Sequence, residues 1–244
     1  MNKKAIYLSV IIPAYNENKL IINTIISIED YFFQRKYIFE VIVVNDASTD
    51  NTKNLVEGLK KTYNNITLIS NQMNMGKGYS VKRGMEIAEG DYRLFMDADN
   101  STSIDQIESF LQAAKEGYDV SIGNRKLKNS TIRTRQSFYK EILGIIGNYL
   151  IHFFAISDIK DTQCGFKLFT KQAAMKVFPK LTINRWGFDI EALALANQYG
   201  LKIKSIPVSW INRKETKVKL SDYVKTFGEL LKIKINQINQ KYDN

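Results

Sequence analysis

The chain of 244 residues is poor in the residue types that build disulfide-stapled, repetitive or unstructured proteins. Its single cysteine, Cys164, excludes an intrachain disulfide framework and indicates a reducing compartment. With only 13 glycines and 3 prolines, it contains no linker, internal repeat or low-complexity tract. A lone histidine, His152, provides no histidine cluster for a metal. Hydrophobic residues make up 44% of the chain, so we expect one substantial core.

Long apolar runs are also missing, because no stretch reaches the roughly 18–20 uninterrupted apolar residues of a membrane-spanning helix. The apolar segment after the basic start is too short for a secretory signal and is better explained as a first strand. Residues 138–156 form the longest mostly apolar segment, broken by two glycines, Asn148 and His152. This segment fits a helix in a membrane interface, packing on the sheet, or a homodimer contact. We therefore expect a cytoplasmic protein, peripheral at the cytoplasmic face of a membrane.

Acidic residues are fewer than basic ones. The chain has 25 aspartates and glutamates and 35 lysines and arginines, which gives a net charge of +10. Nucleic acid, an anionic membrane surface or a polyanionic substrate would each suit this charge, and a lysine-rich genome would produce it with no partner. No signature of interleaved aromatic and basic residues is present, so we expect no nucleic-acid partner. Residues from about 219 to 244 are predicted to form a basic amphipathic helix that attracts anionic lipid.

Buried strands alternate with helices in the first half of the chain. The predicted strands span residues 7–13, 39–45, 66–70, 92–96 and 118–122. The predicted helices span about 17–34, a segment capped by Asp50, 77–88, and a segment from a Ser103–Gln106 capping box to about 115. Further on, we predict a long apolar helix over 134–156, strands over 164–169 and 202–211, and a helix over 187–199. This order predicts βαβ units and a largely parallel sheet.

Ligands of such sheets lie beyond the carboxyl ends of the strands, where this chain has four polar segments. They are residues 13–17, 45–48, 97–99 and 123–125. In the third segment, Asp97 and Asp99 stand two apart, so their carboxylates share a face if the backbone is extended. Two hard carboxylates there suit Mg²⁺ or Mn²⁺ shared with substrate phosphates, although acidic residues at strand ends also cap helices.

Other polar residues near these strand ends suit an anionic ligand. Asp46 is placed to accept from a base imide or a ribose hydroxyl, or to form an Asx-turn. The segment Asn74–Gly78 offers two glycines and Lys77 at a helix N-terminus, which suits a phosphate or nucleoside. It lacks the Walker spacing, which argues against a P-loop NTPase. Three arginines follow the last strand of the first half and suit a second phosphate group or ordinary surface charge. They are Arg125, Arg133 and Arg135.

Together these segments resemble the family-2 glycosyltransferases of the GT-A fold. The matching segments are Val10–Glu17, Val44–Asp50, Asn74–Gly78 and Met96–Asp99. Two later segments, Asp161–Phe169 and Arg185–Glu191, look like the signature of dolichyl-phosphate β-glucosyltransferases, and the resemblance covers about residues 8–212. The chain departs from the common pattern where Asn45 and Ala47 replace Asp and Gly, while Asp46 is kept.

The resemblance implies an inverting transfer of a hexose, with UDP-glucose as the expected donor, to a polyprenyl or dolichyl phosphate at a membrane surface. Mg²⁺ or Mn²⁺ is the implied cofactor, held by Asp97 and Asp99. The implied nucleotide-sugar site consists of Pro13, Tyr15, Glu17, Asp46, Lys77, Asp97, Ala98 and Asp99. The expected catalytic residues are Asp99, Asp189 and Arg125, and the acceptor or sugar pocket is expected to contain Gln163, Trp186, Asp189 and Glu191. The acceptor phosphate is assigned to Arg125, Arg133 and Arg135.

This assignment predicts a single domain over residues 1–244, with a nucleotide-sugar half (1–125), an acceptor half (126–218) and the basic helix (219–244). An acceptor phosphate is already largely anionic at neutral pH, so it needs no strong base. Asp189 and Glu191 would then position the sugar or acceptor, or else cap a helix and lie on its exposed face. Two alternatives stay open: a transferase to a sugar hydroxyl in surface polysaccharide, with Asp189 as its base, and a non-catalytic basic membrane-binding protein.

Overall fold

The computed structural model describes residues 5–132, 159, 161–211 and 220–242, and the structural statements below concern these residues. Its centre is a seven-stranded sheet of order β3-β2-β1-β4-β7-β5-β8. The strands are β1 (Leu8–Ala14), β2 (Phe39–Asn45), β3 (Ile66–Ser70), β4 (Tyr92–Met96), β5 (Val120–Asn124), β7 (Phe166–Thr170) and β8 (Ile203–Pro207). Two short strands, β6 (Thr131–Ile132) and β9 (Ser209–Trp210), pair in a second sheet.

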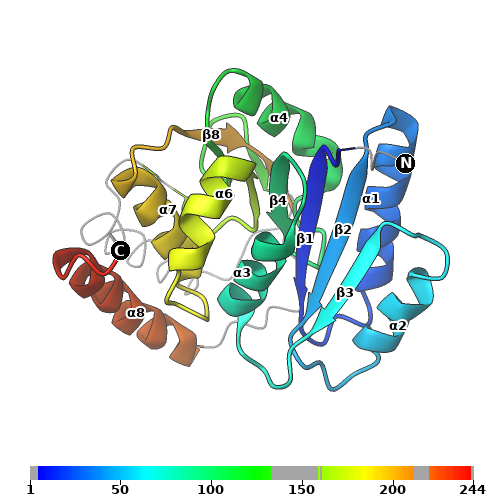
Figure 1. The fold of residues 1–244 in the computed structure, drawn as a ribbon, viewed down its shortest axis with the longest axis horizontal. Helices are drawn as coiled ribbons and strands as arrows, with labels where there is room; N and C mark the ends of the chain where they lie inside the picture. Colours follow the sequence, from blue (N-terminus) through cyan, green and yellow to red (C-terminus); the bar gives the residue numbers. More distant parts are fainter. Residues whose placement is uncertain (1–4, 133–158, 160, 212–219, 243–244) are drawn as a thin grey trace.

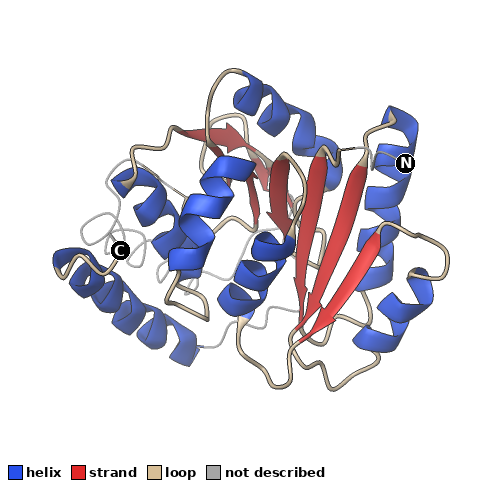
Figure 2. Cartoon of the chain, viewed as in Figure 1, coloured by secondary structure: helices blue, strands red, loops and turns tan. Residues whose placement is uncertain are grey.

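Helices flank the sheet, and α3 and α6 lie in front of its strands in Figure 1. The helices are α1 (Ile21–Arg35), α2 (Thr52–Leu59), α3 (Lys77–Ile87), α4 (Ile107–Lys115), α6 (Lys171–Val177), α7 (Phe188–Gln198) and α8 (Leu220–Ile238), with short 3₁₀ turns η1 (Ile104–Gln106) and η2 (Phe178–Lys180). One buried cluster joins α3, α6, α7 and α8 to one face of the sheet, and a second joins α1 and α4 to the other face. Figure 2 shows the resulting layers of helix, strand and helix.

Strand β1 is mostly apolar because it lies between two layers of helices. Val10 and Ile12 belong to the cluster with α1 and α4, whereas Ile11 belongs to the cluster with α3 and α7. Successive side chains of a strand point to opposite faces, and here both faces are covered, so polar alternation is absent. Parallel pairing of β1 with β2 and β4 brings the carboxyl ends of these strands to one edge, where the predicted site lies.

One strand breaks the parallel pattern. β7 runs antiparallel between β4 and β5, with Leu168 opposite Leu94 on one side and Ser121 on the other. The remaining pairs of the large sheet, β1–β2, β1–β4, β2–β3 and β5–β8, are parallel. The predicted α/β class with a mostly parallel sheet is therefore confirmed, and β7 is the strand that makes the sheet mixed.

Several boundaries differ from those predicted, each for a local reason. The Ser103–Gln106 capping box is wrong, because the Gln106 amide instead pairs with both backbone groups of Ser209, at 3.0 and 2.6 Å. β5 begins two residues later than predicted, because the Tyr118 N–H closes the end of α4 by donating to the Ala113 carbonyl. Gly123 and Asn124 thus lie inside β5 rather than after it.

Other differences concern the ends of helices and strands. β1 spans Leu8–Ala14 rather than 7–13, and Pro13 lies within it, beyond the residues that pair with β4. Asp50 does accept from the Thr52 N–H at 2.9 Å, although Asn51 holds the N-cap position of α2. Helix α6 was not predicted, and Thr170 caps it by accepting from the Ala173 N–H at 3.2 Å.

The predicted C-terminal helix is present as α8. None of the described helices combines the length and apolar character needed to cross a bilayer. The helix predicted over 134–156, including His152, and the two arginines Arg133 and Arg135 lie outside the described residues.

Candidate active site

The segment from Asp97 to Asn100 forms a turn directly after β4, and the Asn100 N–H donates to the Asp97 carbonyl at 3.3 Å. The extended backbone assumed from the sequence is therefore wrong. Ala98 is buried, and its carbonyl accepts from the Thr24 hydroxyl of α1 at 2.7 Å, which ties the turn to that helix. The two carboxylates of Asp97 and Asp99 still interact electrostatically, because the turn keeps them close.

Lys77, the first residue of α3, pairs with the Asp97 carboxylate, with 2.5 Å between Nζ and Oδ1. Burial opposes the charge of this ammonium, but Asp97, Asp189 and Asp99 outweigh it and raise the pKa of Lys77. The Trp186 ring lies 5.6 Å from Nζ, within cation–π range. The structure thus brings together five predicted site residues from the turn after β4, from α3, and from the segment leading into α7.

A second ion pair lies behind the first. Lys167 of β7 is fully buried, and its Nζ lies 2.5 Å from the Asp189 Oδ1 and 2.6 Å from the Cys164 carbonyl oxygen. Burial raises the pKa of Asp189, although the ammonium groups of Lys167 and Lys77 act in the opposite direction. Buried charges persist only when paired, so this pair fixes the start of α7 against the sheet.

These groups form one electrostatic cluster of carboxylates and ammonium groups. Asp97, Asp99 and Asp189 supply the carboxylates, and Lys77 and Lys167 supply the ammonium groups. Burial, followed by repulsion from Asp97, raises the pKa of Asp99. The cluster therefore has one carboxylate in excess, and oxygen donors of this kind suit Mg²⁺ or Mn²⁺.

Gly165 makes room for the Asp97 side chain. A Cβ at this position would lie 1.9 Å from Asp97 Oδ2, and the Asp97 N–H donates to the Gly165 carbonyl at 3.1 Å. The residue before β7 thus sets the position of a carboxylate at the end of β4.

Asp46 is buried after β2 and organises the segment that leads to Lys77. Its carboxylate accepts from the Asn71 amide at 2.7 Å and from the N–H groups of Met75 and Gly76, each at 2.8 Å. Asp46 does not form the Asx-turn that was considered for it, and the neighbouring Asn45 accepts through Oδ1 from the Ser48 N–H three residues on. Asp46 therefore shapes the site through the loop before α3.

The turn after β1 carries three of the predicted donor-site residues. Pro13 is partly buried in β1, and Tyr15 is 38% exposed. The Glu17 N–H donates to the Thr52 hydroxyl at 2.8 Å, which joins this turn to α2. Asn16, at a φ of 54°, accepts from the Thr49 N–H at 2.8 Å, so the turns after β1 and β2 fold as one unit.

Arg125 is already bound by a carboxylate. Its Nε and Nη2 each lie 2.8 Å from an oxygen of Asp161, which also accepts from the Arg125 N–H at 2.9 Å. Burial opposes both charges, but the paired contact raises the pKa of Arg125 and lowers that of Asp161. The Trp210 ring lies 5.2 Å from the guanidinium. Arg125 therefore contributes a fixed positive charge beside the site, with its fork turned to Asp161.

Glu191 is not on an exposed helix face. Its carboxylate is fully buried and accepts from the Thr182 N–H and hydroxyl, from the Ile183 N–H and from the Tyr242 hydroxyl, at 2.7 to 2.9 Å. These bonds tie α7 to the segment before it and to the residues after α8. Glu191 therefore holds parts of the protein together, whereas Gln163, the remaining predicted pocket residue, is exposed.

Glycines allow the segment before α7 to lie directly against the loop before α3. A Cβ at Gly76, where φ is 103°, would lie 2.4 Å from the Asn184 carbonyl oxygen, and one at Gly78 would lie 2.5 Å from Phe188 Cβ. The Tyr79 N–H also donates to the Asn184 carbonyl at 3.0 Å. This contact positions Trp186 over Lys77.

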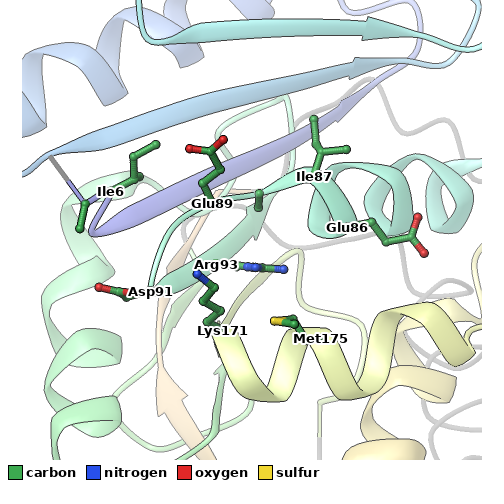
Figure 3. Close-up of a pocket in the computed structure, with 10 residues that line it drawn as sticks. Ile6, Glu86, Ile87, Glu89, Asp91, Arg93, Lys171 and Met175 are labelled. Atoms are coloured by element: carbon green, nitrogen blue, oxygen red, sulfur yellow. The ribbon is translucent and has the colours of Figure 1, made fainter. Parts of the chain in front are cut away.

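A separate hollow of about 570 Å³ lies at the amino-terminal ends of β1 and β4 (Figure 3). Ile6, Asp91, Arg93, Lys171 and Met175 line it together with the residues that end α3. It opens at the opposite end of these strands from Asp97 and Asp99, so the predicted site does not include it.

Sequence reasoning missed the groups that hold the predicted residues in place. Lys167 stands within the apolar segment Phe166–Phe169, and a lysine in a buried strand signals a paired charge. Asp161 and Gly165 stood in the same matched segment without an assigned role. Cys164 between them is buried, and burial raises the pKa of its thiol to about 11.

Solved structures share this fold. The mannosyl-3-phosphoglycerate synthase of Rubrobacter xylanophilus matches with a TM-score of 0.70 and 15% identity, over 98% of this chain and 76% of that one. The glucosyl-3-phosphoglycerate synthase of Mycobacterium tuberculosis, solved with Mn²⁺, UDP and phosphoglyceric acid, matches with a TM-score of 0.68 and 17% identity, over 93% of this chain and 76% of that one. The architecture is therefore that of the GT-A glycosyltransferases.

Sequence similarity identifies the family. The profile of Glycosyl transferase family 2 matches residues 9–178, and the chain belongs to this family. A dolichyl-phosphate beta-glucosyltransferase of Trichomonas vaginalis is 35% identical over 246 residues, covering 96% of this chain and 75% of that protein. Proteins of the same name from Saccharomyces cerevisiae (34%, over 94% of this chain and 75% of that protein) and Drosophila melanogaster (39%, over 83% and 66%) are also similar. The predicted resemblance is confirmed, and the chain is a glycosyltransferase.

Proposed function

We propose that this enzyme transfers glucose from UDP-glucose to dolichyl phosphate or another polyprenyl phosphate, with inversion, at the cytoplasmic surface of a membrane. The observation that carries the proposal is the cluster of Asp97, Asp99 and Lys77 at the carboxyl ends of the central strands. Several relatives of 32–39% identity share the name dolichyl-phosphate beta-glucosyltransferase, which supports the choice of donor and acceptor.

Asp97 and Asp99 are proposed to bind the donor diphosphate through Mg²⁺ or Mn²⁺, which supplies Lewis-acid charge when bound. Among the described residues, no histidine, cysteine or carboxylate cluster of three or more forms a complete metal cage. This fits a metal that takes few protein ligands and shares substrate phosphates. Lys77 is proposed to exchange its contact with Asp97 for the diphosphate, while Pro13, Tyr15, Glu17 and the loop held by Asp46 surround the nucleoside.

The acceptor side of the site fits a phosphate better than a sugar hydroxyl. A phosphate monoester is largely ionised at neutral pH and attacks without a strong base. Asp189, the residue considered as a base, is paired with Lys167 inside the protein. We propose that Asp189, paired with Lys167, holds the start of α7 so that Trp186 lies beside the sugar. Arg125 would attract the acceptor phosphate through its charge, since Asp161 holds its fork, and Arg133 and Arg135 complete the proposed phosphate site.

A transfer screen tests this function. Radiolabelled UDP- and GDP-sugars are offered with polyprenyl phosphate or with sugar-hydroxyl acceptors, with and without Mn²⁺. We expect metal-dependent transfer of glucose from UDP-glucose to the lipid phosphate. Transfer to a hydroxyl acceptor alone would replace the proposal with the polysaccharide alternative, and absence of transfer from every donor would favour the non-catalytic one.

Removal of one metal ligand should abolish this activity. Asp99→Ala is expected to lower kcat by about 100-fold or more, because the charge on the leaving diphosphate loses its metal. The variant should fold normally and lose Mn²⁺ binding measured by electron paramagnetic resonance. Asp105→Ala, which removes an exposed carboxylate from η1, is the matched control and should retain both properties. Substantial turnover by Asp99→Ala would refute the proposed metal role.

A further inference from the structure

Helix α8 is apolar on two opposite faces. Leu230 and Ile233 are buried against the core. Leu231, Ile235 and Ile238 are 38%, 55% and 70% exposed, and their spacing of four and three residues places them in one line along the outer side. We call these three residues the outer stripe. A helix that only covers a core needs a single apolar face, so the outer stripe calls for another occupant.

Positive charge flanks the outer stripe. Lys225, Lys232, Lys234 and Lys241 are exposed in this part of the chain. Between residues 225 and 242 the acidic side chain is Glu229, which turns inward and accepts from the Gly187 N–H at 2.8 Å. From residue 225 to the end of α8, the outer side thus combines apolar side chains with lysines and carries no carboxylate.

We propose that the outer stripe docks on an anionic lipid surface. An apolar line with lysines on both sides is the arrangement by which a helix lies in a membrane interface, where acyl chains take the apolar residues and head groups take the ammonium groups. A second copy of the chain fits less well, because pairing two outer stripes would bring lysines against lysines.

The position of α8 indicates how this docking would affect the candidate active site. Glu229 and Lys232 contact Gly187 and the Thr182 carbonyl, at the two ends of the segment that carries Trp186. In Figure 1, α8 lies along the lower edge of the molecule, the edge toward which β1, β2 and β3 run. A docked α8 would therefore hold the cluster of Lys77 and Asp97 next to the lipid surface. This effect rests on the proposed lipid acceptor, whereas the docking itself does not.

Vesicle flotation without acceptor or donor tests the docking. The full chain should float with phosphatidylcholine–phosphatidylserine vesicles and much less with phosphatidylcholine alone. Ile235→Gln with Ile238→Gln, which preserves helix propensity, should lower partitioning by about tenfold or more. Lys225→Gln with Lys234→Gln should lower it by about fivefold for each lysine, on anionic vesicles only. Phe33→Gln, at an 87% exposed site on α1, is the matched control and should float like the wild type.

The outcomes separate docking from the proposed reaction. Transfer to a short, water-soluble polyprenyl phosphate should be unchanged in the Ile235→Gln, Ile238→Gln variant, which shows that its site is intact. Equal flotation of all variants, or no flotation of the wild type, would overturn the docking. A wild-type dimer in sedimentation that this variant makes monomeric, with flotation unchanged, would assign the stripe to a second copy. If the wild type floats and the Ile235→Gln, Ile238→Gln variant does not, but the wild type transfers sugar to no acceptor, the docking would be supported and the proposed function refuted.

Discussion

Asp99 carries a charge that the folded protein disfavours. Burial and the neighbouring Asp97 both raise its pKa above the value of 3.8 expected for a free carboxyl group. The folded state therefore holds this proton more tightly than the unfolded state. As pH rises from 3.8 through the raised pKa, the contribution of Asp99 to stability falls, so the ionised group destabilises the metal-free protein at neutral pH.

Asp99→Asn should accordingly raise the melting temperature at neutral pH without metal, by about 2–4 °C for each kcal/mol gained. The gain should shrink as pH falls toward 3.8, where the wild-type carboxyl is itself protonated. Mn²⁺ should reverse the order, because it stabilises only the protein that binds it. Thermal unfolding with and without Mn²⁺ measures both effects, and a lower melting temperature of the metal-free variant at neutral pH would contradict this account.

Gly165 allows a second residue-scale prediction. In Gly165→Ala the new methyl group would occupy the position of Asp97 Oδ2, so the carboxylate must move. We expect Mn²⁺ affinity to fall by about tenfold or more, with the fold retained. Gly58→Ala is the matched control, because nothing lies within 4 Å of that Cβ on α2, and it should stabilise the protein by about 0.5–1 kcal/mol. Titration of both variants with Mn²⁺ measures their affinities. Unchanged affinity in Gly165→Ala would contradict the proposal that Gly165 makes room for the Asp97 carboxylate.

Single residues were predictable from the sequence where chemistry and strand ends coincide. Asp97, Asp99 and Lys77 were found because each is polar and stands at the start of a turn or helix. Asp161, the partner of Arg125, was not assigned, because the two are far apart in sequence and no periodicity links them. The Asp46 carboxylate accepts hydrogen bonds from its own chain. Whether a carboxylate does this or faces a ligand depends on tertiary contacts that a sequence pattern does not contain.

At the scale of elements, prediction succeeded where burial alone decides. β2 and β4 have the predicted limits, because mostly apolar runs covered on both faces admit little else, and the edge strand β3 also has its predicted limits. Prediction failed where a side chain can bond either to a local or to a distant partner. Gln106, for example, bonds to the backbone of the distant Ser209. The orientation of β7 was also beyond the sequence, since an apolar strand of five residues looks the same in either direction.

The link between α7 and α8 gives an element-scale prediction. Glu191→Gln places an amide that donates among four donors, so we expect a loss of about 2–4 kcal/mol in the free energy of unfolding. Tyr242→Phe removes one of these bonds and should cost about 1 kcal/mol. Glu86→Gln, at an exposed site on α3, is the control and should stay within about 0.5 kcal/mol. Urea unfolding measures all three, and equal stability of Glu191→Gln and Glu86→Gln would contradict the buried network.

At the scale of the whole molecule, the site draws on distant parts of the chain. Lys77 and Asp97 come from the first half, whereas Lys167, Trp186 and Asp189 come from the second. Family resemblance gave the fold class and the location of the site, because motif order follows strand order. It did not give the contacts between the halves, which depend on glycines such as Gly76 and Gly165 that let backbone and side chains approach closely.

The insertion of β7 between β4 and β5 has a consequence for synthesis on the ribosome. In the described sheet, β5 pairs with β7 and β8, which both follow it in the chain. A nascent chain that ends soon after Asn124 therefore has an unpaired β5 and an open edge on β4, and both are able to pair with other chains. The sheet becomes continuous only once residues 166–170 have emerged, so chaperone binding to the nascent chain would be most useful between these two points.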